Sequence, residues 1–361
     1  MNDTTVTMRQ FHIIVVFTTL STAFFLLPSS LIADAKQHAW LVPLWTGAAG
    51  IASTLPWIYL ARRHARLNLM QINERILGRP FGKLANLMLL FHMVIVCAWV
   101  LNNLDDFMTT TLMQQTKEWV FDAAFLFTAL YAAQKGITAI ARTAELFAPM
   151  LIAMFSVFFV LAVHSWDWSQ FAPAAEFDWS GILRKPSYMI AFPFMDGFMF
   201  VMIFPYIKEK AGANYVKCAA AGALLLSLIT FIVTGVLGVS RAPHVTFPLF
   251  VMAQELMISS FLEHMEATIA ILWFALVFVK LSFTFYCAIT GIAQTCGMRS
   301  GGLIAVPLAI LIVGFAQSMH RNLIENLEWL ARYLLPYYSL NTLALPLLLI
   351  AVDLIRRRRA A

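Results

Sequence analysis

The stretch Ile190-Ala191-Phe192-Pro193-Phe194-Met195-Asp196-Gly197-Phe198 decides how this chain is interpreted, and it lies inside an apolar run of about residues 186–206. Pro193 cannot donate a backbone hydrogen bond, and Gly197 loses extra backbone entropy in a helix. Asp196 is an acid at a depth where acids are costly. A helix that breaks at mid-membrane to expose its backbone and a carboxylate to a ligand would use all three residues. A proline-kinked helix whose Asp196 contacts neighbouring helices is the alternative.

The composition indicates a membrane protein. Of the 361 residues, 61% are hydrophobic and 12% are charged, and the mean hydropathy is +0.77. A soluble domain carries roughly 25% charged residues, so this chain has too few to cover a surface that faces water. Apolar runs long enough to cross a bilayer recur from end to end. We therefore expect an all-α polytopic membrane protein with a single integral membrane domain over residues 1–361.

The apolar runs predict ten transmembrane helices. Their approximate ranges are 11–33, 40–61, 84–104, 119–134, 146–164, 186–206, 215–238, 267–291, 302–318 and 333–355. Two other segments, 69–77 and 246–262, are expected to form helices on the membrane surface. With the N-terminus inside, the inner loops carry seventeen Lys and Arg residues and the outer loops carry seven. This asymmetry predicts that both termini are cytoplasmic.

The C-terminal run Arg356–Arg359 has two interpretations. It is typical of a stop-transfer signal, and it would also be attracted to anionic lipids of the inner leaflet.

Ten spans divide into two sets of five, residues 11–164 and 186–355. Because five is odd, the second set enters the membrane from the opposite face, so two similar halves form an inverted repeat, as in many secondary transporters. The first helix of each half is then the broken one. In the first span, the small residues Ser21-Thr22-Ala23 mark the expected break, and Pro28 follows.

Several stretches along the whole chain carry a family resemblance. They are Gln37-His38-Ala39-Trp40, Ile76–Lys83, Lys135–Arg142, Phe192–Asp196, Phe204-Pro205-Tyr206, Glu266, Trp273 and Lys280. The order and spacing of these stretches resemble those of the spore germination permeases. These permeases are the B-subunit type of nutrient germinant receptor and belong to the amino acid–polyamine–organocation transporter superfamily. The resemblance implies a LeuT-like fold, A-type and C-type partner subunits, and a location in the inner membrane of the bacterial endospore.

The expected ligand is a small nutrient, most simply an amino acid. Half-helix N-termini favour a carboxylate, so the break at Ser21, Thr22 and Ala23 is expected to bind that group. Asp196 would accept the ammonium group of the ligand in a charge-assisted hydrogen bond. The other residues expected around the ligand are Trp99, Phe194, Gly197 and Phe198. For the aromatic residues, ordinary helix packing is the alternative.

Lys280 is the second charge inside the expected membrane. It lies about 14 residues into its span, or ~21 Å from the outer end at the helical rise. In the LeuT-like architecture that the resemblance implies, its ammonium group could take the place of a sodium ion, and its protonation would then set proton coupling. The alternatives are snorkelling to the interface and a structural ion pair with Asp196.

The sequence contains no nucleophile motif, metal-ligand cluster or phosphate-binding glycine loop, so we expect no enzyme activity, cofactor or metal. Its four cysteines form no C-x-x-C pair. Three functions stay open: a ligand-binding receptor subunit, a proton-coupled amino acid transporter, and a membrane scaffold that binds no ligand.

Overall fold

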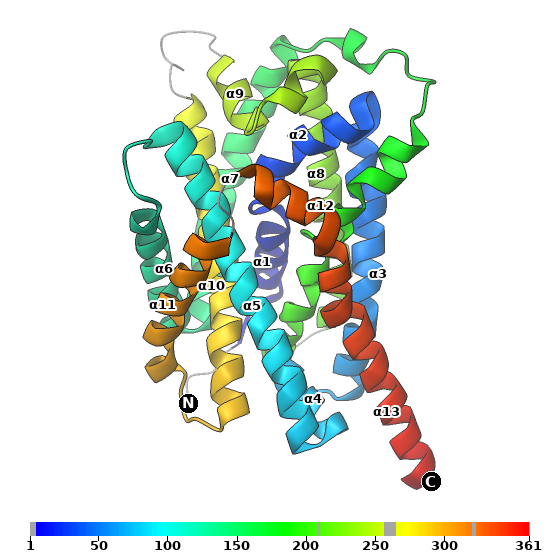
Figure 1. Cartoon of the computed structure of the whole chain (residues 1–361), viewed down its shortest axis with the longest axis vertical. Coiled ribbons are helices and arrows are strands. Elements are labelled where there is room, and N and C mark those ends of the chain that lie inside the picture. Colours follow the sequence, from blue (N-terminus) through cyan, green and yellow to red (C-terminus); the bar gives the residue numbers. More distant parts are fainter. Residues whose placement is uncertain (1–4, 208–209, 256–264, 320–322, 361) are drawn as a thin grey trace.

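The computed structural model describes residues 5–207, 210–255, 265–319 and 323–360. Its helices pack side by side into an elongated bundle (Figure 1). The α-helices are α1 (Met8–Leu20), α2 (Ala23–Ala35), α3 (Val42–Arg63), α4 (Leu69–Leu77), α5 (Arg79–Phe107), α6 (Glu118–Lys135), α7 (Ile137–His164), α8 (Ala211–Arg241), α9 (Pro248–Glu255), α10 (Met265–Cys296), α11 (Gly302–Met319), α12 (Leu323–Ser339) and α13 (Leu345–Ala360). Three short helical segments matter for the site: η5 (Lys185–Ile190) and η6 (Met195–Met202), which are 3₁₀ segments, and the π-helical η10 (Leu340–Ala344).

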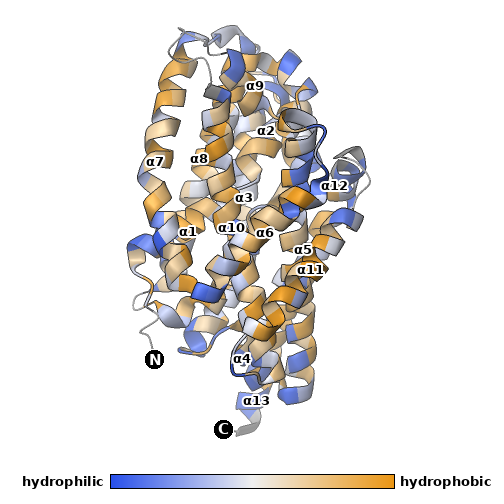
Figure 2. Cartoon of the chain, turned by 90° about the vertical axis from the view of Figure 1, so that its left-hand side faces the viewer, coloured by the Kyte–Doolittle hydropathy of each residue, from blue (hydrophilic) through white to orange (hydrophobic). Residues whose placement is uncertain are grey.

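The bundle has the hydropathy of a membrane protein. Seven stretches in the described part of the chain are helical, long and apolar enough to cross a membrane: Ala23–Arg63, Arg79–Leu112, Ile137–His164, Ala211–His244, Glu266–Cys296, Gly302–Met319 and Glu328–Arg358. The first covers the whole of the second expected span, 40–61, and only residues 23–33 of the first, while α6 and residues 186–206 are not among the seven. The count of ten therefore stays a prediction. Hydrophobic residues dominate the middle of the bundle and polar ones gather near its ends (Figure 2).

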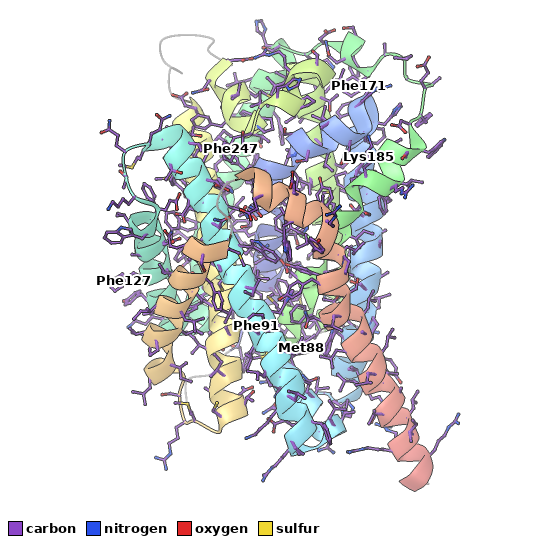
Figure 3. All side chains as sticks on the ribbon, in the orientation of Figure 1. Met88, Phe91, Phe127, Phe171, Lys185 and Phe247 are labelled. Atoms are coloured by element: carbon purple, nitrogen blue, oxygen red, sulfur yellow. The ribbon has the colours of Figure 1, made fainter. Side chains whose placement is uncertain are left out.

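Large apolar side chains cover the outside of the bundle. Phe127 on α6 is 71% exposed and projects from its side (Figure 3). Leu146 on α7 and Leu303 on α11 are 73% and 81% exposed. A water-soluble protein seldom exposes so much contiguous apolar surface, whereas lipid favours it.

Local sequence signals set several helix ends. Thr7 and Gln10 form a capping box at the start of α1, and Asn68 and Gln71 form another at the start of α4. Gly78, with φ of 83°, ends α4 and precedes α5. Positive φ favours glycine, because an L side chain is strained there. The bounds of α4 match the helix predicted over residues 69–77.

Two segments interrupt the regular helices. α1 ends at Leu20, Ser21 has non-helical angles (φ 8°, ψ −113°), and α2 begins at Ala23. The second interruption lies between η5 and η6, where residues 191–194 form turns. Short 3₁₀ segments have poorer hydrogen-bond geometry than an α-helix, so this stretch is less regular than its neighbours.

Close packing holds the second interruption against α3. A Cβ atom added to Gly50 would collide with Phe194 and lie 2.8 Å from the carbonyl oxygen of Ile190. On Gly47 it would lie 2.6 Å from the Cβ of Ala223. α3 can approach the turn and α8 only because these positions lack side chains.

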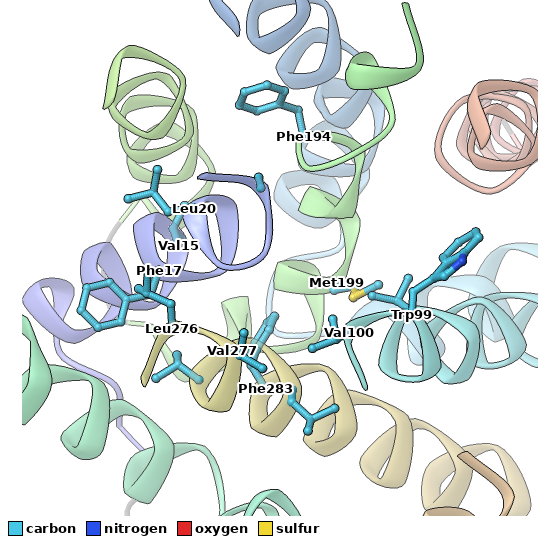
Figure 4. Close-up of a cluster of buried hydrophobic side chains, with 14 of the residues drawn as sticks. Val15, Phe17, Leu20, Trp99, Val100, Phe194, Met199, Leu276, Val277 and Phe283 are labelled. Atoms are coloured by element: carbon cyan, nitrogen blue, oxygen red, sulfur yellow. The ribbon is translucent and has the colours of Figure 1, made fainter. Parts of the chain in front are cut away.

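A hydrophobic core joins the two interrupted segments to α10. Leu20, Met199, Val277 and Phe283 are all buried, and Figure 4 shows α1, α10 and the segment that carries Met199 around a common interior. The rings of Phe200 and Phe283 stack with centroids 4.6 Å apart. This core brings residues from both halves of the chain to the middle of the bundle.

The helix that contains the last expected span is longer than that span. The sequence predicts a span of about residues 333–355, whereas α12 begins at Leu323 and continues through η10 into α13. Asp105, near the end of α5, is only 2% exposed. Gln317 on α11 donates to Asp122 (2.7 Å) and Asp105 (3.4 Å), which holds both acids between α5, α6 and α11.

The expected surface helix at residues 246–262 is described only in part. The described part of α9, Pro248–Glu255, is eight residues long. Leu249 and Met252 are buried, so one side of α9 packs onto the bundle. The remaining residues, 256–262, lie outside the described part of the chain.

Candidate functional site

A buried ion pair lies at the centre of the bundle. The Nζ atom of Lys280 on α10 donates to Oδ2 of Asp196 on η6 at 2.9 Å, and the two side chains are 3% and 12% exposed. Nζ also lies 4.8 Å from the ring centroid of Phe192, within the range of a cation–π contact. Each charge would be strongly unfavourable alone at this depth, so each depends on the other.

A cavity of about 420 Å³ begins at Lys280. Its walls come from α2, α5, η5, the turn after α8, α10 and α12, and they include Thr22, Trp99, Tyr188, Phe192 and Tyr338. The hydroxyl of Thr22 is buried without a hydrogen-bond partner among the described residues. The volume lies within the roughly 300–1,000 Å³ of ligand pockets.

The cavity is accessible from one end of the bundle. Ala33, His244 and Thr246 border it and are exposed, and this is the end at which α9 lies (Figure 1). Beyond Asp196 along η6, the ring of Phe200 packs against Phe11 and Tyr215, with centroids 5.9 and 5.4 Å away. All three side chains are buried.

The structure brings some of the predicted site residues to the cavity. Thr22, Trp99 and Lys280 line it, and Asp196 contacts Lys280 directly. Ser21 does not line the cavity, because its hydroxyl points to the carbonyl oxygen of Leu276 on α10 at 3.4 Å.

The remaining predicted residues pack beside the site. Ala23 is buried in the core and does not border the cavity. Phe194 packs against α3, and Phe198 packs against Trp57 and His92, with ring centroids 6.4 and 5.4 Å away. Gly197 leaves room for the hydroxyl of Tyr215, which a Cβ atom would overlap. In this conformation they support the segment that carries Asp196.

Sequence reasoning missed the contribution of α12. Asn326, Leu330, Leu334 and Tyr338 all line the cavity. Their spacing of four residues places them on one helix face. The signal was present in the sequence, but polar residues between 319 and 332 suggested a loop. Tyr338 also packs edge-on against His92, with ring centroids 4.5 Å apart.

The arrangement suits a small ligand that carries both charge and apolar surface. The inner end of the cavity offers the Lys280 ammonium group and the Thr22 hydroxyl, while Trp99 and Leu334 offer apolar walls. A carboxylate is the natural partner of the first two groups. Among the described residues, no group of three His, Cys, Asp or Glu side chains could hold a metal ion.

Sequence comparison relates the chain to germination proteins. The model of a family described as "Spore germination protein" matches residues 5–324. Spore germination protein KB of Bacillus subtilis (strain 168) is 22% identical over 369 residues, which covers 99% of this chain and 97% of that protein. Spore germination protein YndE of the same organism is 20% identical, and the match covers 98% of this chain and 97% of that protein. Spore germination protein GerQB of Bacillus cereus is 21% identical and covers 81% of each.

Structure comparison relates the fold to LeuT-fold transporters. MhsT in complex with L-phenylalanine matches with a TM-score of 0.62 and 15% identity, covering 92% of this chain and 87% of MhsT. A Na⁺-coupled sialic acid symporter matches with a TM-score of 0.66 and 13% identity, covering 92% of this chain and 77% of the symporter. At such identities the likeness concerns the fold alone. The expected all-α, LeuT-like fold class is therefore confirmed at this level.

Proposed function

Because this chain belongs to the spore germination protein family, we propose that it is the ligand-binding membrane subunit of a spore nutrient germinant receptor. It binds a small nutrient, an amino acid by preference, in the cavity above the Asp196–Lys280 pair. The observation that carries the proposal is this pair: Lys280 lines the cavity, and Asp196 contacts Lys280 directly. An intramembrane ion pair beside such a cavity is the usual mark of a ligand or ion pathway.

The ligand geometry follows from the groups around the cavity. The ligand carboxylate binds between the Thr22 hydroxyl and the Lys280 ammonium group, and Trp99 packs against the ligand side chain. When Lys280 turns towards the carboxylate, Asp196 becomes available to the ligand ammonium group. The other predicted residues do not contact the ligand and keep the two interrupted segments in place. They are Ser21, Ala23, Phe194, Gly197 and Phe198.

The architecture that we propose is a pair of five-helix repeats, residues 11–164 and 186–355, within one membrane domain of ten spans. The interruptions support it, because one lies in the first span of each half. Both termini face the cytoplasm across the inner membrane of the endospore. The A-type and C-type receptor subunits are the proposed partners, and they receive the conformational change that the nutrient induces.

A proton-coupled amino acid transporter is the second candidate. The likeness to solved LeuT-fold transporters supports it, one of which was determined in complex with L-phenylalanine. In that function, Lys280 releases and takes up the coupled proton, and the cavity must open alternately to both sides. The third candidate, a scaffold without a ligand, requires that Asp196 and Lys280 only stabilise the fold.

One experiment separates the three functions. The purified chain is reconstituted in liposomes, and a panel of labelled amino acids is tested for uptake under a pH gradient and for thermal stabilisation of the protein. Stabilisation without uptake is the expected result and indicates a receptor. Saturable, proton-driven uptake would indicate a transporter, and no response to any ligand would leave the scaffold. Lys280→Met should abolish stabilisation by the ligand, whereas Lys117→Met, at an exposed position, should not.

A further inference from the structure

One end of the bundle carries a surface of exposed cations, which we call the basic surface. Its members lie at the end of α3, on α4, at the start of α5 and at the end of α13, and they are Arg62, Arg66, Arg75, Arg79, Lys83 and Arg356–Arg358. Figure 1 places α4 and the C-terminal end of α13 at the same end of the molecule, opposite α9. The basic surface is therefore remote from the mouth of the cavity.

Tertiary contacts assemble this surface from distant parts of the chain. Asp353 on α13 forms an ion pair with Arg63, whose Nε lies 2.6 Å from Oδ2, and this pair ties α13 to the end of α3. Nε2 of His64 lies 3.6 Å from Oδ1 of the same carboxylate. Nε of Arg357 lies 3.6 Å from the same carboxylate. α4 is joined to α5 through a hydrogen bond of 2.9 Å between Asn73 and Asn86.

Among the described residues, the acids near the basic surface are too few to neutralise all of its cations. Residues 36–104 and 340–361 contain only two acidic residues, Glu74 and Asp353. Glu74 is half-buried and accepts from Asn86, while Asp353 is 9% exposed and engaged with Arg63. Burial lowers the pKa of His64 below its ordinary value, which favours its neutral form. The exposed cations therefore form a positively charged surface that attracts anions.

Exposed apolar side chains lie directly beside the cations. Phe81 and Leu84, next to Arg79 and Lys83 in sequence, are 68% and 65% exposed. Leu354 and Ile355, just before the arginine run, are 45% and 54% exposed. Apolar residues that face lipid, followed at once by cations, mark the boundary between the hydrocarbon and the headgroups of a bilayer. In a bilayer, this arrangement would place the cations at the depth of the lipid phosphates.

We propose that the basic surface binds the phosphate groups of anionic phospholipids, with their acyl chains along the exposed side chains of α5 and α13. Charge complementarity and the apolar border favour a lipid over an acidic segment of a protein, which would need no adjacent hydrocarbon. This lipid site goes beyond nutrient binding and is independent of it, because it shares no residue with the cavity.

The test measures binding of fluorescent phosphatidylglycerol and phosphatidylcholine to the full chain in an uncharged detergent. The quadruple variant Arg62→Gln/Arg66→Gln/Arg356→Gln/Arg358→Gln removes four cations of the basic surface. The matched control, Lys36→Gln/Lys117→Gln/Arg184→Gln/Lys185→Gln, removes four exposed cations elsewhere in the chain. Each surface charge of this kind changes the affinity for an anionic lipid by about fivefold. Because the first variant lacks four such charges, we expect it to lose at least a hundredfold in affinity for phosphatidylglycerol. The control should change little.

Wild-type protein should also prefer phosphatidylglycerol to phosphatidylcholine, and the preference should fall with added salt. This comparison needs no variant, so it stands even if a substitution impairs folding. Equal binding of the two lipids would overturn the proposal. A second result would also overturn the proposal: the quadruple Arg→Gln variant keeps its lipid affinity but no longer co-purifies with a partner subunit. The basic surface would then bind an acidic protein.

Discussion

At the residue scale, the ion pair between Asp196 and Lys280 dominates the interior. Its atoms are 2.9 Å apart although the residues are separated by 84 positions in the chain. Removing both charges from a buried pair is often tolerated, but removing one leaves an unpaired charge in an apolar medium. The pair therefore links the stability of the fold to the chemistry of the proposed site.

We predict that Asp196→Asn and Lys280→Met each destabilise the protein by about 3–5 kcal/mol, because each leaves one charge buried alone. The double variant Asp196→Asn/Lys280→Met should regain most of that loss. Thermal unfolding of the four proteins in one detergent gives the coupling energy. Additive losses in the double variant would show that the two side chains do not depend on each other.

At the element scale, α3 controls the position of the interrupted segment between η5 and η6. Gly50 lies against Phe194 and the carbonyl oxygen of Ile190, so the backbone of α3 supports the turn directly. The irregular segment makes few of the regular hydrogen bonds that stabilise a helix, and neighbouring elements must hold it. The proposed role of Asp196 therefore depends on the packing of α3 as well as on its own chemistry.

Gly50→Ala is predicted to cost about 1–3 kcal/mol, since the added methyl group forces the turn away from α3. Ligand affinity should fall with it, because the turn carries Phe192 and leads into Asp196. Gly314→Ala on α11 is the matched control: a Cβ atom there meets nothing within 4 Å, and alanine favours a helix. It should raise stability slightly and leave affinity unchanged. Equal effects of both substitutions on affinity would exclude a special role for Gly50.

At the scale of the whole molecule, the cavity opens at one end and the basic surface lies at the other. The positive-inside asymmetry predicts that the basic end is cytoplasmic. The nutrient would then reach the cavity from outside the inner membrane. Charge distribution and cavity access thus give one consistent orientation.

The cysteines allow a direct test of this orientation. Cys97, Cys218 and Cys287 are buried, whereas Cys296, the last residue of α10, is exposed. In sealed, right-side-out vesicles, a membrane-impermeant maleimide should label Cys296 only after permeabilisation. In a Cys296→Ala background, Thr246→Cys at the cavity mouth should be labelled at once. The reverse pattern would invert the proposed topology.

The sequence by itself determined the class of protein and the residues worth examining. Hydropathy and charge counts are sums over local composition, so they indicate a helical membrane protein without knowledge of any contact. The breaks near Ser21 and Pro193 and the helix at 69–77 depend on glycine, proline and capping residues, whose preferences are also local. Asp196 and Lys280 stood out because charges in an apolar run are costly wherever the helix lies.

Only the tertiary structure decided which of these residues share a site. In the structure, Asp196 pairs with Lys280, and Thr22 and Trp99 line the cavity. Phe194 and Phe198 do not line it, because they pack against α3 and α5. The structure also added the face of α12 that carries Leu330 and Tyr338. The physical reason is that a side chain's neighbours depend on how helices far apart in the sequence pack and rotate, which local composition does not encode.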